Sequence, residues 1–204
     1  MGRYFWAMDM EPGPAKPYHH GDLRSALLAA AETELAMRGV EAFSLRQVAR
    51  RAGVSHAAPA HHFGDAGGLL TALAAHGYRA FQQVLDDRMA QAGNDPRARQ
   101  MAAGLGYISF ATARPALFRL IFGSDRIDFA DPDLVAAASH AYSRLEAGVM
   151  ALSAEAGPAD VVAVWAMVHG LADLMVGCRL KGLQDLPPDQ RDAALQQILA
   201  RSMP

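Results

Sequence analysis

The sequence has little cysteine, few aromatic residues and little net charge. Cys178 is the single cysteine among 204 residues, so no internal disulfide can form, which fits a reducing cytoplasm. Aromatic residues make up 7% and hydrophobic residues 51%. With alanine abundant, this composition favours helices around a full core over strands. The formal net charge of −2 gives the chain as a whole no basic signature for nucleic acid.

Long apolar runs are also scarce. Residues 1–17 have neither a long apolar stretch nor a small-residue cleavage site, so we expect no signal peptide there. Their proline and glycine content predicts a flexible N-terminal arm. The most apolar later stretch is interrupted by His169 and Asp173, which favours a buried helix over a membrane span. We therefore expect a cytoplasmic protein without a membrane segment.

Helical periodicity and capping signals run through the chain. Leu23, Leu27 and Leu35 repeat every four residues or multiples of four, and Asp22 and Gly39 are suitable start and stop residues for a helix over 22–38. Similar signals predict helices over 45–51, from Ser55, from Asp65 to Gln91, and over 97–112, 115–122, 132–155, 158–181 and 188–202. No segment alternates like a strand, so the predicted fold class is all-α with about nine helices.

Two short helices joined by a glycine turn suggest a helix-turn-helix. Ser44 is a good N-cap for the first helix, and Gly53 can take the positive φ that the turn needs. We expect Ser55 to cap the second helix and Pro59 to lie in its first turn, where a missing N–H costs little. The pattern fits DNA binding, and it also fits any tight helical hairpin.

The wider stretch over residues 18–73 contains the segments RGVEAFSLRQVARRAGVS and HHF and then a capped long helix. It resembles the DNA-binding domain of TetR-family transcriptional regulators. The later segment WAMVHGLADL resembles the C-terminal domain of a subgroup marked by Trp165, His169 and Gly170. The resemblance implies a helix-turn-helix domain over 18–64. It also implies a linker helix with a ligand-binding and dimerisation domain over 65–204, and a homodimer that binds a palindromic operator in double-stranded DNA.

The resemblance also implies which residues lie at the DNA. Side chains at the start of the first short helix would meet phosphate or a guanine edge, and the second short helix would enter the major groove. The expected DNA-binding residues are Ser44, Arg46, Ser55, His56, Ala57, Pro59, His61 and His62. The sequence departs from the family pattern at Ala60 and Ala66, where a tyrosine and a lysine usually contact phosphate. This departure predicts either weak DNA binding or binding that strengthens as the histidines gain charge at lower pH.

The three histidines have two other interpretations. His56 and His61 could belong to a metal site, but they are five positions apart with no thiolate or carboxylate at ligand spacing. We therefore expect no metal. Each of the three histidines could equally be a solvated surface residue.

Aromatic residues of the second half predict an apolar ligand cavity. The expected ligand-binding residues are Tyr107, Phe110, Phe118, Phe122, Trp165, His169 and Asp173. Trp165, His169 and Asp173 are spaced four apart on one helix. They form either part of a core helix with a hydrogen-bonded histidine, or a pocket wall in which Asp173 holds His169. The expected ligand is a small apolar or amphipathic effector, and we expect no cofactor.

The helix predicted over 158–181 has two apolar faces. Trp165, Ala172 and Val176 fall on a bulky face that suits the domain's own core. The opposite face is rich in small residues, and apolar positions of the last helix could extend it into a four-helix bundle across a two-fold axis. The expected dimer interface consists of Ala163, Met167, Gly170, Leu174, Gly177, Ala194, Leu195, Ile198 and Leu199.

The sequence contains no nucleophile with a base and an orienting group, no phosphate loop and no zinc signature. We therefore do not expect an enzyme. We expect a ligand-responsive, sequence-specific transcriptional regulator, and specifically a repressor that a small molecule releases from DNA. Two alternatives remain: a TetR-like protein with weakened operator binding that acts through protein partners, and a small-molecule-binding protein.

Overall fold

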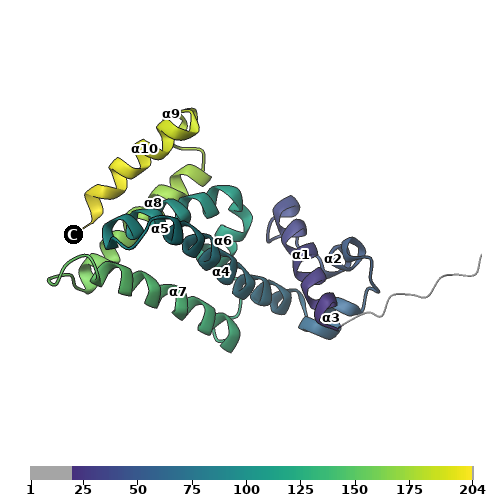
Figure 1. The fold of residues 1–204 in the computed structure, drawn as a ribbon. Coiled ribbons are helices and arrows are strands. Elements are labelled where there is room, and N and C mark those ends of the chain that lie inside the picture. Colours follow the sequence, from purple (N-terminus) through teal and green to yellow (C-terminus); the bar gives the residue numbers. More distant parts are fainter. Residues whose placement is uncertain (1–19, 204) are drawn as a thin grey trace, which may run out of the picture.

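The structure, a computed structural model, describes residues 20–203, and this part of the chain is helical without strands (Figure 1). The all-α prediction is confirmed. The predicted arm over 1–17 lies outside the described residues. The helices are α1 (His20–Arg38), α2 (Leu45–Ala52), α3 (Ala58–Phe63), α4 (Ala66–Gln91), α5 (Pro96–Ala113), α6 (Pro115–Gly123), α7 (Pro132–Met150), α8 (Pro158–Val176), α9 (Lys181–Gln184) and α10 (Pro188–Leu199), followed by the 3₁₀ turn η1 (Ala200–Ser202).

Several helix ends differ from the prediction, among them the end of α10 at Leu199 in place of 202, and the described residues form ten α-helices in place of about nine. Helix α1 begins at His20, two residues before the expected cap. Helix α7 ends at Met150, where Leu152 N–H donates to the carbonyl of Val149 at 3.0 Å in a tighter turn. Helix α8 ends at Val176 because Cys178 adopts a φ of 54°. The chain then re-enters a helix as α9.

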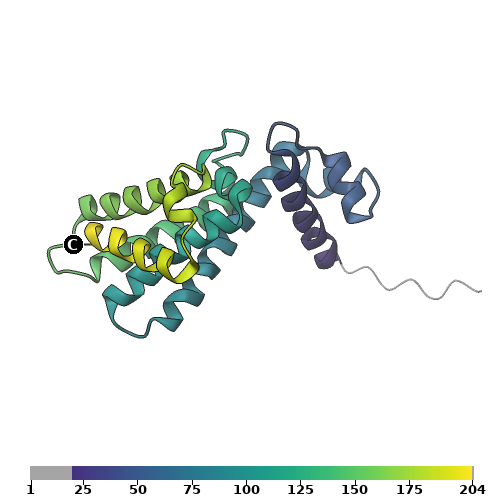
Figure 2. The same cartoon turned by 90° about the horizontal axis from the view of Figure 1, so that it is seen from above.

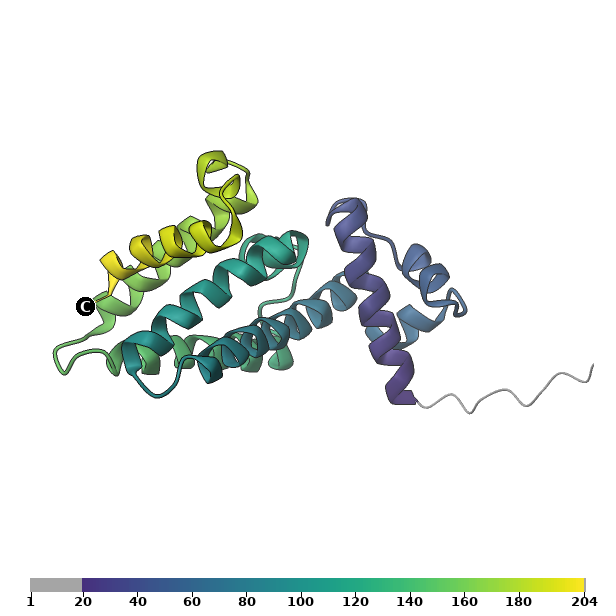
Figure 3. The same ribbon diagram turned by 45° about the horizontal axis from the view of Figure 1, so that its top comes forward.

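A small unit of three helices, α1 to α3, lies at one end of the molecule, and a larger bundle of α5 to α10 lies at the other (Figures 1 and 2). Helix α4, with 26 residues, runs from the small unit into the bundle. It packs against α1, α5, α6 and α7. Figure 3 shows α8 and α10 on the same side of the bundle. The long helix α4 therefore packs against helices of both the helix-turn-helix unit and the larger domain and connects the two.

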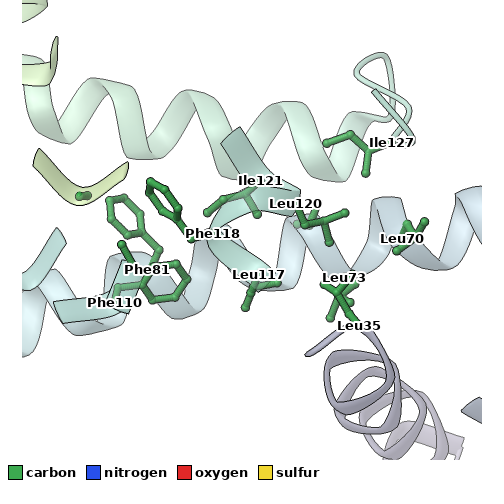
Figure 4. Close-up of a cluster of buried hydrophobic side chains, with 14 of the residues drawn as sticks. Leu35, Leu70, Leu73, Phe81, Phe110, Leu117, Phe118, Leu120, Ile121 and Ile127 are labelled. Carbon is green, nitrogen blue, oxygen red and sulfur yellow. The ribbon is translucent and has the colours of Figure 1, made fainter. Parts of the chain in front are cut away.

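One continuous apolar core runs through both parts (Figure 4). Leu35 of α1 meets Leu73 of α4 at one end of this core, and Phe81 and Phe110 lie toward the other. Side chains of α6, including Leu117 with 1% of its surface exposed, fill the space between them. Full burial of a leucine or phenylalanine side chain contributes roughly 1.5–3 kcal/mol. Helix α6 is therefore the packing element between the small unit and the bundle.

Gly77 allows α4 and α6 to approach closely. A Cβ added at Gly77 would lie 2.9 Å from Leu117 Cδ1 and 3.0 Å from Ile121 Cγ2. Contacts this short would force the two side chains aside, so a residue without Cβ is needed here. The α4–α6 contact is consequently tight, and the two helices constrain each other.

Candidate DNA-binding surface and ligand cavity

Helix α2 begins where the sequence predicts. Ser44 has the extended backbone of an N-cap, and its carbonyl accepts from Val48 N–H at 3.0 Å. Its hydroxyl makes no capping bond within the described helix, so it is available to a phosphate. Val48 and Ala49 are fully buried, whereas Arg46 is exposed. Helix α2 thus presents Ser44 and Arg46 outward from a firmly anchored backbone.

The turn after α2 depends on Gly53. Its φ of 68° lies in the left-handed region, as predicted. Val54 N–H donates to the carbonyl of Ala49 at 3.0 Å, which closes the end of α2. Val54 itself packs against the core.

Helix α3 begins later than predicted. Its N-cap is Ala57, and Ser55 precedes it in a turn in which Ala58 N–H donates to the Ser55 carbonyl at 3.1 Å. The reason is Pro59, which has no N–H to donate to the Ser55 carbonyl in the ordinary helical pattern. This corrects the predicted cap. Pro59 is also buried on the inner side of α3, which makes a direct contact with DNA less favourable at this position.

The remaining predicted DNA residues lie around the start and outer face of α3. Ser55, His56, Ala57 and His61 are exposed. His62 is half-buried, with its ring centroid 5.7 Å from that of His61 in an edge-to-face arrangement. Among the described residues, no group of three or more histidine, cysteine, aspartate or glutamate side chains could hold a metal ion. DNA contact by the exposed residues stays a prediction.

A buried carboxylate, which sequence reasoning missed, ties α2 to α1. Glu34 has 1% of its side chain exposed and lies 3.3 Å from Arg51 Nη2 and 3.6 Å from Arg38 Nε. The i,i+4 spacing of Glu34 and Arg38 was visible in the sequence, but the approach of Arg51 depends on how α1 and α2 cross. The ion pair holds the Arg51 side chain against α1 and fixes the orientation of α2 relative to α1.

The junction with α4 requires glycine. The Asp65 carboxylate accepts from Gly68 N–H at 2.8 Å, which confirms the predicted cap. A Cβ added at Gly68 would lie 2.0 Å from the carbonyl oxygen of Phe63, whereas one at Gly67 would lie 3.3 Å from Asp65 Oδ1. Helix α4 can therefore start this close to α3 only with Gly68.

Two ion pairs join the helix-turn-helix unit to the larger domain. Arg126, in the loop after α6, lies 3.1 Å from Glu41, which follows α1. Arg114, directly before α6, lies 3.4 Å from Glu32 of α1. Both pairs are partly exposed, so each contributes little stability alone. The two pairs lie at opposite ends of α6, so ion pairs as well as the shared apolar core connect this helix to α1 and the residues that follow it.

The larger domain contains a cavity of about 480 Å³ between α4, α5, α7 and α8, and its end is lined by Leu199 and Met203. Three of the predicted ligand residues, Tyr107, Phe122 and Trp165, line it. Phe110 and Phe118, each 2% exposed, belong to the core behind it. An apolar cavity is thus present in the predicted domain, with Phe110 and Phe118 in the core and not in its lining, and the binding of a ligand there stays a prediction.

His169 lies behind the cavity wall and is held by Tyr107. Its Nδ1 is 2.8 Å from the Tyr107 hydroxyl, and the rings of Phe118 and Phe122 lie 5.4 and 5.3 Å away between centroids. Burial raises the pKa of Tyr107, so the hydroxyl stays protonated and can share this hydrogen bond with the imidazole.

Asp173 does not hold His169. Its side chain is 55% exposed and lies 3.9 Å from Arg179 Nη1 at the end of α8. Four helical residues advance the side-chain direction by about 40° beyond a full turn, which carries Asp173 to the solvent edge. The interpretation as a core helix with a hydrogen-bonded histidine is therefore the better one, with Tyr107 as the partner.

Helix α8 has an apolar face without a partner in the single chain. Val162, Met167 and Leu174 are 56%, 38% and 37% exposed. A Cβ added at Gly170 would meet no described atom within 4 Å. Among the described helices, α8 alone is long and apolar enough to cross a membrane by length and composition. Its inner face is nevertheless buried against α5 and α7.

The last helix is placed differently from the prediction. Leu195 and Leu199, expected at the dimer interface, are 4% and 3% exposed and belong to the domain's own core. Leu199 meets Gly104 of α5, where an added Cβ would lie 2.9 Å from Leu199 Cδ1. Trp165, expected in the core, is 38% exposed. A sequence pattern shows an apolar face but cannot show which neighbour covers it.

A three-helix helix-turn-helix unit continuous with a larger all-helical domain defines a class of transcriptional regulators. The chain belongs to the TetR family. The family model of bacterial regulatory proteins of the tetR family matches residues 27–73. A model of the tetracyclin repressor-like C-terminal domain matches residues 100–201. The protein is therefore a DNA-binding regulator of this family and not an enzyme.

Solved structures agree with this assignment. A protein of unknown function from Rhodococcus sp. RHA1 is 36% identical, with 93% of this chain and 99% of that one covered and a TM-score of 0.76. A TetR-like transcriptional regulator from the same organism is 16% identical, with 90% and 97% covered and a TM-score of 0.65. The fatty acid degradation regulator FadR from Bacillus halodurans is 14% identical, with 91% and 97% covered and a TM-score of 0.66. The last two show the fold alone, and no curated protein matches the chain.

Proposed function

We propose that the protein is a homodimeric repressor that leaves its operator when a small molecule fills the cavity of the larger domain. The observation that carries this proposal is the position of the cavity. Tyr78 and Phe81 of α4 and Phe122 of α6 line it, and the same two helices form the apolar core with α1 (Figure 4). A molecule in the cavity therefore touches the helices on which the DNA-binding unit rests.

The dimer would form through the outward face of α8. We expect Ala163, Met167, Gly170 and Leu174 on this face, and Gly177 directly follows α8. The small residues Ala163 and Gly170 permit a close helix pair, and Met167 and Leu174 add apolar surface. A two-fold axis there sets two copies of α3 side by side. Two recognition helices about 34–36 Å apart read successive major grooves of a palindrome, which one alone cannot do with specificity.

Release would follow from a shift between two packings of α4 and α6. A ligand that binds one packing better than the other shifts the population by its difference in affinity. Helix α6 reaches α1 through the Arg114–Glu32 pair and through its leucines. A small displacement of α6 is therefore passed to α1 and changes the distance between the two recognition helices.

A second candidate is a family member with weakened operator binding that acts through protein partners. Ala60 supports it, since this exposed position carries no phosphate-contacting group. The burial of Pro59 supports it as well, because a buried residue offers little surface for one of the expected contacts. A flat binding curve against every DNA in a randomised pool would favour this candidate.

The test begins with selection of an operator from randomised duplexes by the full chain, followed by fluorescence anisotropy. Arg46→Ala should weaken operator binding by about 1–3 kcal/mol, because a good contact to a base edge is worth this much. If Arg46 reads a guanine, preference at one operator position is lost. If it contacts phosphate, the loss is uniform across sequences. Arg201→Ala in η1 is the matched control, and equal affinities for the two variants would remove Arg46 from the site.

A further inference from the structure

The cavity is lined by both exposed residues, termed its rim, and buried residues, termed its floor. The exposed residues Ser139, Tyr142 and Ser143 of α7 line the rim. Deeper in, the lining is apolar and aromatic, apart from the buried side chains of Gln82 and Gln100. Buried polar groups fix the orientation of a ligand in an otherwise apolar site. The hydrogen-bonding state of these two amides therefore indicates what the cavity accepts.

The two glutamines differ in one respect. Gln82 Nε2 donates to the carbonyl of Ala137 at 2.9 Å, so that side chain serves the packing of α4 on α7. Gln100 is 8% exposed and lines the cavity, and its amide has no hydrogen-bond partner within residues 20–203. A Cβ added at Gly148 would lie 2.5 Å from Gln100 Oε1, so glycine leaves room for the amide. The Gln100 amide is not among the fully buried side-chain atoms without a partner, so it stays accessible from the cavity and can bond to a ligand there.

The two tyrosine hydroxyls of the floor are already hydrogen-bonded. Tyr78 donates to the carbonyl of Ile121 at 3.0 Å, and the Tyr107 hydroxyl is bonded to His169. Arg144 is the one charged residue of the described lining, and it forms an ion pair with Asp86. No unpaired charge of either sign therefore faces the interior from the described residues. A charged ligand would lose its hydration there without a counter-charge.

We infer that the cavity binds an uncharged, largely aromatic molecule with one hydrogen-bonding group that pairs with the Gln100 amide. Six aromatic side chains support the aromatic part: Tyr78, Phe81, Tyr107, Phe122, Tyr142 and Trp165. Aromatic rings prefer edge-to-face or offset contacts with another ring, and such a wall offers both. The inference rests on the proposed function, because it names the chemical class of the effector at the same site.

The test uses three probes of nearly equal shape at neutral pH, with affinities from isothermal titration calorimetry on the full chain. The probes are 2-naphthamide, which carries an uncharged donor and acceptor, naphthalene, which carries neither, and 2-naphthoate, which carries a negative charge. We expect 2-naphthamide to bind about tenfold tighter than naphthalene, the worth of one well-placed hydrogen bond. We expect 2-naphthoate to bind about a hundredfold more weakly than 2-naphthamide, or not measurably.

Gln100→Leu tests the assigned group. This variant should bind 2-naphthamide and naphthalene equally, because leucine keeps the volume and removes the amide. Gln83→Leu is the matched control, since Gln83 lies on the exposed side of α4 and bonds Asp87. It should keep the tenfold preference. Gln100→Glu is a second variant, and its carboxylate should weaken binding of 2-naphthoate further.

Three results would overturn the inference. These are a stronger affinity for 2-naphthoate than for 2-naphthamide, an unchanged preference in Gln100→Leu, and no binding of any probe by the folded chain. Operator release is measured separately, by adding 2-naphthamide to the protein–DNA complex. If the probes bind in the expected order but DNA is not released, the proposed repressor mechanism fails while the ligand assignment stands.

Discussion

The helix-turn-helix unit and the larger domain differ in where their functional groups lie. In the unit, most of the residues predicted to contact DNA are exposed, and local signals place them: a cap at Ser44 and a positive φ at Gly53. In the larger domain, the groups that define the cavity are buried, and contacts between distant helices place them. Tyr107 and His169, for example, are 62 residues apart in sequence and share a hydrogen bond. Local sequence signals therefore suffice to place the predicted DNA-binding surface, whereas the cavity depends on the packing of the whole bundle.

The largest expected effect is the loss of the proposed dimer. Gly170→Leu adds bulk to the outward face of α8 without a clash inside the chain, because no described atom lies within 4 Å of an added Cβ. We expect monomers and a loss of specific operator binding by about 4 kcal/mol or more, the usual gap between specific and non-specific binding.

Analytical ultracentrifugation checks the oligomeric state of Gly170→Leu, and anisotropy checks its operator binding. Gly182→Leu in α9 is the matched control, since a Cβ there also meets nothing within 4 Å. An intact Gly170→Leu dimer would place the interface elsewhere on the molecule.

The second effect concerns the boundary between the two regions. Gly68→Ala would put a Cβ 2.0 Å from the Phe63 carbonyl oxygen, which neither backbone can avoid without moving. We expect a loss of about 3 kcal/mol in the free energy of unfolding, measured by urea titration. Gly67→Ala is the neighbouring control, with a milder contact at 3.3 Å, and it should stay within about 1 kcal/mol of the parent because alanine favours helix. Equal stabilities for the two variants would contradict the close approach of α3 and α4.

The third prediction tests the contribution of the half-buried His169 to stability. Tyr107→Phe removes the hydroxyl bonded to His169 Nδ1 and leaves a half-buried ring nitrogen without that partner. The expected cost is about 1–2 kcal/mol of unfolding free energy, with the fold retained. Tyr142→Phe, at the exposed rim of the cavity, should change the stability by less than about 0.5 kcal/mol. A larger loss of stability for Tyr142→Phe than for Tyr107→Phe would show that the Tyr107–His169 hydrogen bond does not stabilise the fold as expected.

The smallest effect is a pH dependence at the contact between the regions. Burial lowers the pKa of His76 on α4, against a weaker opposing effect of Glu32, and Arg114 lowers it further. The unfolded chain therefore binds a proton at His76 more readily than the folded chain does. Stability should fall as the pH drops below the ordinary value of 6.5 and level off below the lowered pKa. Comparison of His76→Asn with the exposed control His140→Asn measures this contribution, and identical pH profiles for both would remove His76 as its source.

The fold class and most helix starts could be predicted from the sequence, because proline in a first turn and an aspartate cap act locally. Asp65 and Asp131 both cap helices as such signals require. The end of α8 could not be predicted, since the left-handed Cys178 is not a residue type that marks a stop. The predicted start of α3 at Ser55 was wrong because Pro59 has no N–H to donate to the Ser55 carbonyl, so the helix begins only after Ala57.

The functional residues could be predicted from the sequence less completely than the helix boundaries. Exposed candidates such as Arg46 and His56 lie on the surface that the pattern indicates. Gln100 was not among the candidates, although its amide is buried in the cavity lining and has no hydrogen-bond partner among the described residues. A single glutamine in a helix carries no sequence signal, because its importance arises from the residues that other helices place around it.

The unbroken core that joins Leu35 to Phe110 has a consequence for how the molecule melts. Elements that share one core lose it together, so calorimetry should record a single cooperative transition for the whole chain. An isolated fragment of α1 to α3 would expose the leucines that α4 and α6 now cover, and it should not be a faithful substitute for the intact protein. Any compound that stabilises the cavity should also slow amide hydrogen exchange in α1, far from where it binds.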